Sequence, residues 1–228
     1  MSRYPQVVAS LMFPIFLVSC TTAKDRTLDP SGTAAAVALN NSALEFKKQG
    51  NFHAAEDNEE KAVLLLKTSL GEDHPDTATA LGNWAGILVA DGKADKALPL
   101  YMQSISIQQK TLGPDHPDLA ATYASLGDVL TKDGKHEEAL DFFRRAADID
   151  VRSFGPDSIS TGEILDLMAN ASVAKGDKPL ARSYLTQIRE IIAKNGTRCT
   201  PAQTPVSGDC ARLKKLRDDS AKIEAQTR

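Results

Sequence analysis

The four histidines and three cysteines of this 228-residue chain are the side chains best suited to metal binding or nucleophilic catalysis. His74 and His116 stand 42 residues apart, and each precedes Pro-Asp at the expected start of a helix. A shared metal site could use both, but capping of the two helix starts explains their spacing better. His53 and His136 stand at the starts of two other helices and look solvated. We therefore expect neither a metal nor a cofactor.

Catalytic motifs are also missing from the sequence. No Ser-His-Asp order, glycine-rich phosphate loop or pair of carboxylates occurs in the structural context that its chemistry requires. The formal net charge is -3, and basic residues form no stripe of the kind that binds nucleic acid. We expect a protein that is not an enzyme, has no small-molecule substrate and does not bind nucleic acid.

The N-terminus looks like a targeting segment. Residues 7–18 are apolar and follow a single charge, Arg3. A mature membrane-spanning helix needs about 20 residues, so this run is too short and is typical of a signal peptide. It ends in the letters LVSC, which resemble the bacterial lipobox, with Leu17 three places before Cys20. The resemblance implies removal of residues 1–19 and acylation of the new N-terminus.

Acylation at Cys20 would anchor the chain stably to a membrane, because several acyl chains would enter the bilayer. Thr21 follows the cysteine, and the absence of an aspartate there favours the outer membrane of a bacterial envelope, facing the periplasm. The alternative is an ordinary secretory signal whose cysteine has no role. Residues 20–33 are polar and turn-forming, which is typical of a flexible tether.

Two cysteines remain if Cys20 is acylated. Cys199 and Cys210 would then be an even pair in a compartment that permits disulfides, and we expect them to form one. Two free thiols are the alternative. We expect no metal site here, since no histidine stands near the pair.

The chain repeats itself every 42 residues. The segment GEDHPDTATAL at position 71 recurs as GPDHPDLAATY at position 113. Glycines and alanines keep the same interval, at Gly50, Gly92, Gly134 and Gly176, and at Ala55, Ala97, Ala139 and Ala181. A fixed period of this length is the signature of a repeat architecture.

Each repeat predicts two helices. The second repeat gives a first helix over residues 76–90, a turn at Gly92, and a second helix over residues 94–112. The second helix of the third repeat has the three-four spacing of a one-sided helix, with apolar residues at Ala139, Phe142, Phe143, Ala146 and Ile149.

These residues resemble the tetratricopeptide repeat (TPR), in its 42-residue kinesin-light-chain-like form. The third repeat has the family's signature positions at Tyr123, Leu126, Gly127, Leu130, Gly134, Ala139, Phe143 and Ala146. The resemblance implies an all-α solenoid of four repeats, over about 34–75, 76–117, 118–157 and 158–194. Residues 195–228 would add a loop and a capping helix. Glu59 and Ser172 depart from the apolar pattern, as expected where a terminal repeat meets solvent.

The family resemblance also implies a concave surface lined by the first helix of each repeat, where other proteins or peptides bind. Asparagines there can hold a peptide backbone, because an amide both donates and accepts hydrogen bonds. The corresponding positions are Asn40, Asn41, Lys47, Lys48, Asn83, Ser125, Asp128, Lys132, Asp166 and Asn170. The alternatives are an ordinary solvated helix face or a binding site on the convex side.

We therefore expect a membrane-anchored periplasmic lipoprotein that acts as an adaptor or scaffold for other proteins. The alternative is a permanent structural subunit of an envelope assembly or secretion complex.

Overall fold

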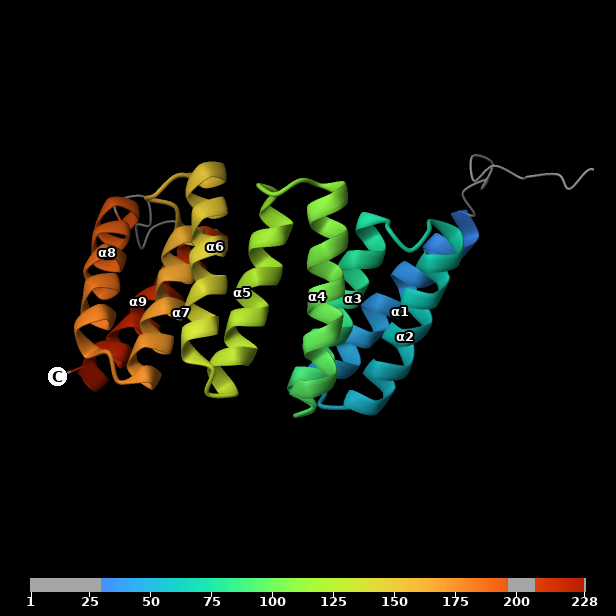
Figure 1. The fold of residues 1–228 in the computed structure, drawn as a ribbon, viewed down its shortest axis with the longest axis horizontal. Coiled ribbons are helices and arrows are strands. Elements are labelled where there is room, and N and C mark those ends of the chain that lie inside the picture. The colour runs from blue at the N-terminus through green and yellow to red at the C-terminus, as the bar shows by residue number, and fades with distance from the viewer. Residues whose placement is uncertain (1–29, 197–207, 228) are drawn as a thin grey trace, which may run out of the picture.

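The computed structural model describes residues 30–196 and 208–227, and within these ranges every element is an α-helix (Figure 1). The all-α prediction is confirmed. Cys20 and Cys199 lie outside the described residues. The helices are α1 (Pro30–Lys48), α2 (Phe52–Ser69), α3 (Pro75–Ala90), α4 (Ala94–Thr111), α5 (Pro117–Lys132), α6 (His136–Phe154), α7 (Ile159–Lys175), α8 (Lys178–Gly196) and α9 (Gly208–Thr227).

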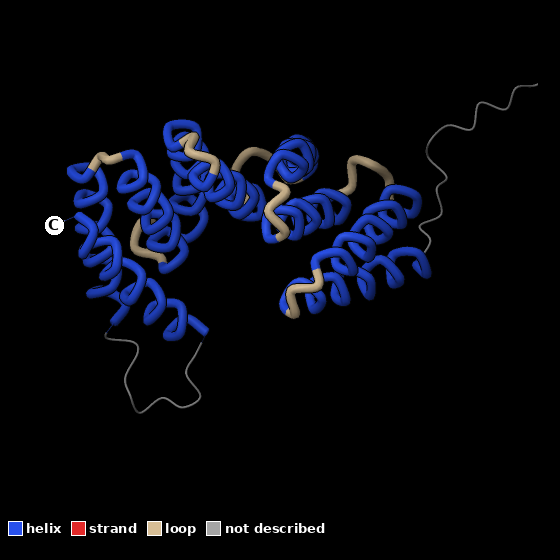
Figure 2. Tube along the Cα trace, turned by 90° about the horizontal axis from the view of Figure 1, so that it is seen from below, coloured by secondary structure: helices blue, strands red, loops and turns tan. Residues whose placement is uncertain are grey.

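The first eight helices form four antiparallel pairs, one for each predicted repeat. We call α1, α3, α5 and α7 the A row and α2, α4, α6 and α8 the B row. Consecutive A-row helices contact one another, whereas within the described ranges no two B-row helices do. The A row therefore lies on the inner side of a curved array, and Figure 2 shows this bend.

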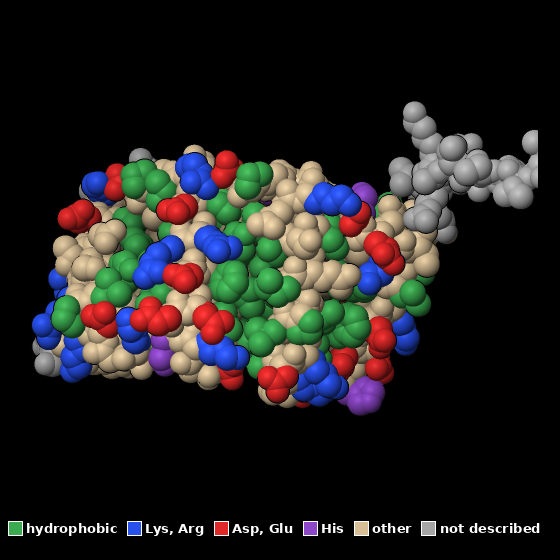
Figure 3. Space-filling view, viewed as in Figure 1, with side chains coloured by type: hydrophobic (Ala, Val, Ile, Leu, Met, Phe, Trp, Pro, Cys, Tyr) green, Lys and Arg blue, Asp and Glu red, His purple; other side chains and the backbone are tan. Residues whose placement is uncertain are grey.

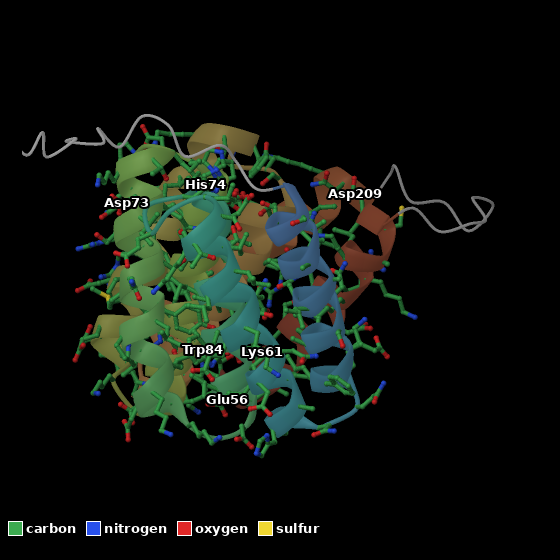
Figure 4. The ribbon with its side chains drawn as sticks, turned by 90° about the vertical axis from the view of Figure 1, so that its right-hand side faces the viewer. Glu56, Lys61, Asp73, His74, Trp84 and Asp209 are labelled. Atoms are coloured by element: carbon green, nitrogen blue, oxygen red, sulfur yellow. The ribbon has the colours of Figure 1, made fainter. Side chains whose placement is uncertain are left out.

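Histidine caps start two of the A-row helices. His74 Nδ1 accepts a hydrogen bond of 3.1 Å from the Asp76 amide, and His116 Nδ1 accepts one of 3.2 Å from the Asp118 amide. A proline follows each histidine at the first helical position, where its missing N–H costs nothing. Figure 4 shows His74 beside Asp73 at the link end of α3. The capping role predicted for these histidines is confirmed.

His136 departs from its predicted solvated state. It is the first residue of α6 and is only partly exposed, and its buried Nδ1 has no hydrogen-bond partner in the described ranges. His53, the second residue of α2, is exposed as expected.

Within a repeat, a large side chain of the B-row helix packs against a small residue of the A-row helix. Phe143 of α6 is 1% exposed, and its ring lies over Gly127 of α5. A Cβ atom at Gly127 would lie 2.6 Å from Phe143 Cε1, closer than real Cβ contacts come. This position sits between the two helices of one repeat, so it is covered whether or not the repeat is terminal.

That geometry corrects the prediction for Glu59 and Ser172. Glu59 is the repeat equivalent of Phe143 and is 0% exposed, and within the described part of the chain neither carboxylate oxygen has a hydrogen-bond partner. Burial raises its pKa to about 7. Ser172 is also fully buried, and its hydroxyl donates to the Met168 carbonyl oxygen at 2.7 Å. Both side chains are therefore buried rather than facing solvent.

The two ends of the array also differ slightly from prediction. Helix α1 begins at Pro30, four residues before the expected start of the folded part, since proline suits a first turn and Gly32 is buried. Residues 30–33 are therefore part of helix α1 rather than of the tether. Helix α9 packs on both α7 and α8, in keeping with a capping helix.

Ion pairs between successive repeats follow the same period. The aspartate of each link pairs with a basic residue 37 positions later, at the end of the next B helix. Asp115 pairs with Arg152 at 2.6 Å and Asp157 with Lys194 at 2.6 Å, and Asp73 pairs with Lys110. Exposed pairs of this kind contribute little to stability, but their equal separation in sequence reflects a constant arrangement of successive repeats.

Candidate partner-binding groove

The inner A row carries three hollows along its length. The N-terminal hollow, about 150 Å³, lies between α1 and α3. Asn40 and Asn83 form its polar wall. Asn83 Nδ2 donates a hydrogen bond of 2.7 Å to Asn40 Oδ1, and this bond joins the neighbouring A-row helices α1 and α3. Its apolar wall includes Val37, which is largely exposed. The structure thus brings together two of the predicted groove residues.

The central hollow, about 250 Å³, lies between α3, α4 and α5. Asn83 and Ser125 both line it, and the Ser125 hydroxyl is held by the Ala121 carbonyl oxygen at 2.9 Å. Gln108 of α4 also lines this hollow, from the B row. Its side chain is 3% exposed, and its Oε1 has no hydrogen-bond partner among the residues that the structure describes. A buried amide oxygen without a partner can accept from a backbone N–H of a bound chain.

Lys47 is partly buried on the inner side. A Cβ atom at Gly86 would lie 3.3 Å from Lys47 Nζ and 3.5 Å from the Tyr101 hydroxyl, so the glycine leaves room for the ammonium group. Burial lowers the pKa of Lys47. Lys48 is exposed and pairs with Glu45 at 3.4 Å.

Asp128 and Lys132 pair with each other. Their side chains, one turn apart on α5, form an ion pair of 2.7 Å, and both are substantially exposed. A partner would therefore meet a dipole at this point of the row rather than two independent charges. Asn41 is exposed and makes no side-chain hydrogen bond in the part of the chain that is described.

The C-terminal hollow is the largest, at about 530 Å³, and lies between α7 and α9. Asp166 and Asn170 line it from α7, and Asn170 Nδ2 donates to the Asp166 carbonyl oxygen at 3.0 Å and to Asp166 Oδ2 at 3.3 Å. Burial raises the pKa of Asp166 to about 6, with a further contribution from the nearby Asp219 carboxylate.

Sequence reasoning missed every residue that α9 contributes to this hollow. These are Lys215, Leu216, Asp219, Lys222, Ile223 and Gln226. The apolar spacing of α9 predicted a helix, but nothing in the sequence indicated which surface of the fourth repeat it covers. Gln108 was missed for a different reason, because it belongs to a B helix. The ten predicted groove residues do not form a single pocket.

The cysteine predictions are tested only in part. Cys210 stands at the start of α9 and is disulfide-bonded. Because Cys199 lies outside the described residues, its pairing with Cys210 stays a prediction. In the described ranges, no group of three or more His, Cys, Asp or Glu side chains is placed to hold a metal ion.

Four helix pairs with a curved inner row define a helical-repeat protein, and comparison with known proteins identifies the repeat. A tetratricopeptide repeat model matches residues 76–150 and 126–194, and a second one matches residues 35–76. The first alone covers more than half of the sequence. The chain belongs to the tetratricopeptide-repeat family.

Solved structures share the fold. One is a structure of the nearly identical TPR-like repeats of a Podosopora anserina kinesin light chain. It aligns with a TM-score of 0.65 and 22% identity, covering 84% of this chain and 92% of that one. BtubC (BKLC) from P. vanneervenii aligns with a TM-score of 0.62 and 16% identity, covering 90% of this chain and 92% of that one. The kinesin-light-chain-like form of the repeat is therefore confirmed at the level of fold. A search of curated proteins gives no match.

Proposed function

We propose that this protein is a lipid-anchored adaptor of the bacterial periplasm that holds an extended segment of a partner protein along its A row. Tetratricopeptide repeats mediate protein–protein interaction, and this coarser role follows from the family. The observation that carries the finer proposal is the succession of hollows on the inner side of the array. A continuous inner row suits an extended chain better than a compact ligand.

The polar groups of the first two hollows suit a peptide backbone. Asn83 lines both hollows. In the N-terminal hollow it donates a hydrogen bond to Asn40, and in the central hollow it lies in the same wall as Gln108 and Ser125. Gln108 Oε1 lacks a donor. These amides and hydroxyls can donate and accept without demanding a charge on the partner.

The anchor rests on the lipobox resemblance that ends at Cys20. No helix in the described ranges is both long enough and apolar enough to cross a bilayer. Labelled palmitate should enter the native protein but not Cys20→Ala, and the native protein should sediment with membranes. A native protein that takes up no label and stays in the soluble fraction would rule out the anchor while leaving the adaptor role open.

Site-specific photocrosslinking tests the adaptor role. A crosslinking amino acid at Ser125, which is exposed in the central hollow, should capture a partner in intact cells. The same amino acid at Ser106 is the matched control, because Ser106 is exposed on the B-row helix α4. Capture from both positions alike, or from Ser106 alone, would move the site to the outer side.

One observation favours the second candidate, a permanent subunit of an envelope assembly. Hydrophobic side chains gather in the middle of the face shown in Figure 3, over α4 and α5. Among B-row residues, Met102 of α4 is 52% exposed and Phe154 of α6 is 54% exposed. Patches of this kind can mark protein interfaces. A partner that remains bound in fixed ratio through detergent extraction and native mass spectrometry would favour the permanent subunit over the adaptor.

A further inference from the structure

A buried carboxylate in the wall of the C-terminal hollow has one oxygen without a partner among the described residues. Asp166 is 9% exposed, and its Oδ1 has no hydrogen-bond partner in residues 30–196 and 208–227, whereas Oδ2 accepts from Asn170. An ionised carboxylate only accepts hydrogen bonds, and leaving one of its oxygens buried and unpaired is costly. The Asp166 side chain lines an open hollow of about 530 Å³, which a donor from another molecule can enter.

The other charges around the hollow are differently engaged. Glu163 accepts from Arg212 at 2.7 and 3.0 Å, and Asp219 pairs with Lys222 at 2.8 Å. Lys215 is exposed and forms no ion pair in the described part of the chain. No cation there lies within ion-pair distance of Asp166. The hollow is thus lined by three carboxylates and two ammonium groups, and the buried carboxylate is the one left without a countercharge.

Apolar side chains form the rest of the wall. Leu167 comes from α7, and Leu216 and Ile223 come from α9. A long aliphatic stem that ends in a cation matches this combination, because lysine and arginine lay their methylene groups on apolar surface while the head group finds a carboxylate. A shorter or uncharged side chain would leave either the wall or Asp166 Oδ1 unused.

We infer that the hollow between α7 and α9 binds a lysine or arginine side chain of the partner polypeptide, with Asp166 Oδ1 as its acceptor. This inference rests on the proposed function, since the same partner segment would lie along the A row. The match to the repeat family ends at residue 194, whereas six of the ten residues that line this hollow come from α9. Selection for a basic residue is therefore a property that the capping helix adds to the repeat array.

The test uses two small ammonium ions, so it does not depend on knowing the partner. The carbon-13 signal of the Asp166 carboxyl is followed by NMR across a pH titration of the purified protein. Added n-butylammonium, which has N–H donors and an aliphatic stem, should lower the pKa of Asp166 saturably. Tetramethylammonium at equal ionic strength has no N–H donor and should leave that pKa unchanged. The other charged groups acting on Asp166 are Glu163 and Asp219, which raise its pKa, and Lys215 and Lys222, which lower it.

Two isosteric variants complete the experiment. Asp166→Asn should abolish the butylammonium-dependent amide shifts of Asn170 and Ile223, and its melting curve checks that it is folded. Asp218→Asn removes an equal charge from an exposed position on α9 and should keep those shifts. Equal responses to the two ammonium ions, no saturable response to butylammonium, or shifts that survive in Asp166→Asn would each overturn the inference. None of these results bears on crosslinking at Ser125, so the adaptor role can stand or fall separately.

Discussion

Asn83 Nδ2 lies 2.7 Å from Asn40 Oδ1, and this hydrogen bond joins two A-row helices across 43 residues of sequence. The bond fixes the orientation of both amides in the wall of the groove. It also gives Asn83 a structural role in addition to its proposed contact with a partner.

Replacement of Asn83 should therefore cost some stability. Asn83→Ala removes one partly buried hydrogen bond and leaves Asn40 to find water, so the free energy of unfolding should fall by about 1 kcal/mol. Asn41→Ala is the matched control, because Asn41 is an exposed asparagine on the same row and should change stability by less than about 0.5 kcal/mol. Equal values for the two variants in urea titrations would show that the bond contributes nothing.

Glu59 should make the native protein less stable as the pH rises. Its pKa is raised from 4.5 to about 7 in the folded state, so between these values the folded chain holds a proton that the unfolded chain has released. The penalty is absent below pH 4.5, grows through this window and is complete above about 7. The free energy of unfolding of Glu59→Gln, relative to that of the native protein, should therefore rise by about 3 kcal/mol between pH 4.5 and pH 7.

The control for this prediction is Glu60→Gln, since Glu60 is the exposed neighbour on the same helix. Asp166 also has a raised pKa and adds its own pH dependence, but it is present in native and variant protein alike. Urea titrations at several pH values give the comparison. A constant difference between native protein and Glu59→Gln across the window would refute the buried, unpaired state of this carboxyl.

Two glycines on the A row should respond in opposite ways to alanine. Gly127→Ala places a Cβ atom 2.6 Å from the fully packed Phe143 ring, and overpacking of this kind costs about 1–3 kcal/mol. Gly82→Ala places its Cβ 3.6 Å from Ser104 Oγ, an ordinary contact, and should gain up to about 1 kcal/mol from helix propensity. Because Gly82 lines the central hollow, the more stable variant should also bind its partner less well. Equal stability of the two variants in thermal melts would contradict the packing.

The disulfide prediction concerns Cys199 and Cys210. Alkylation of periplasmic material without reduction should leave both thiols unmodified. Closure of the short loop between them contributes about 3 kcal/mol in the chain-entropy model, so changing both to serine should lower the Tm while the helices still form. The native protein under reducing conditions serves as the control and should melt like the double variant. Free alkylation of both residues in native protein would refute the bond.

The repeat made most of the array predictable. Each position occurs in several copies, so one copy helps to predict the environment of another. Tyr101 and Phe143 occupy the same repeat position and predict an apolar, buried environment there. His74 and His116 are likewise equivalent, and both cap a helix. Equivalence to Phe143 predicts that Glu59 is buried between the two helices of its repeat. The expectation that a terminal repeat faces solvent predicts that Glu59 is exposed. Glu59 is buried, because the two helices of its own repeat cover this position even in a terminal repeat.

Helix α9 had no such copy to guide prediction. Leu213, Leu216 and Ile223 indicated an amphipathic helix, and all three are buried as that pattern requires. The surface that α9 covers depends on its fit to α7 and α8, including the pairing of Arg212 with Glu163, which is 49 residues distant in sequence. Contacts between elements without internal repetition cannot be deduced from spacing alone, so the largest hollow of the groove was not predicted.

The central claim is that the A row holds the partner, and a triple variant tests it most directly. Asn83→Ala, Asp128→Ala and Lys132→Ala together remove an amide and an intact ion pair from the inner side. The matched control carries Gln103→Ala, Asp141→Ala and Arg144→Ala, which remove an amide and an intact ion pair from the B row.

The decisive measurement is the amount of each partner recovered with either variant from membrane extracts, with the Tm recorded alongside. Loss of the ion pair costs about 0.3–0.5 kcal/mol and loss of the Asn83 bond about 1 kcal/mol, so the inner variant should melt only slightly below the control. A residue that grips a partner can cost 2 kcal/mol or more in binding, so recovery with the inner variant should fall at least about 30-fold while the control keeps native recovery. Native recovery with the inner variant, or an equal loss with both, would contradict the account.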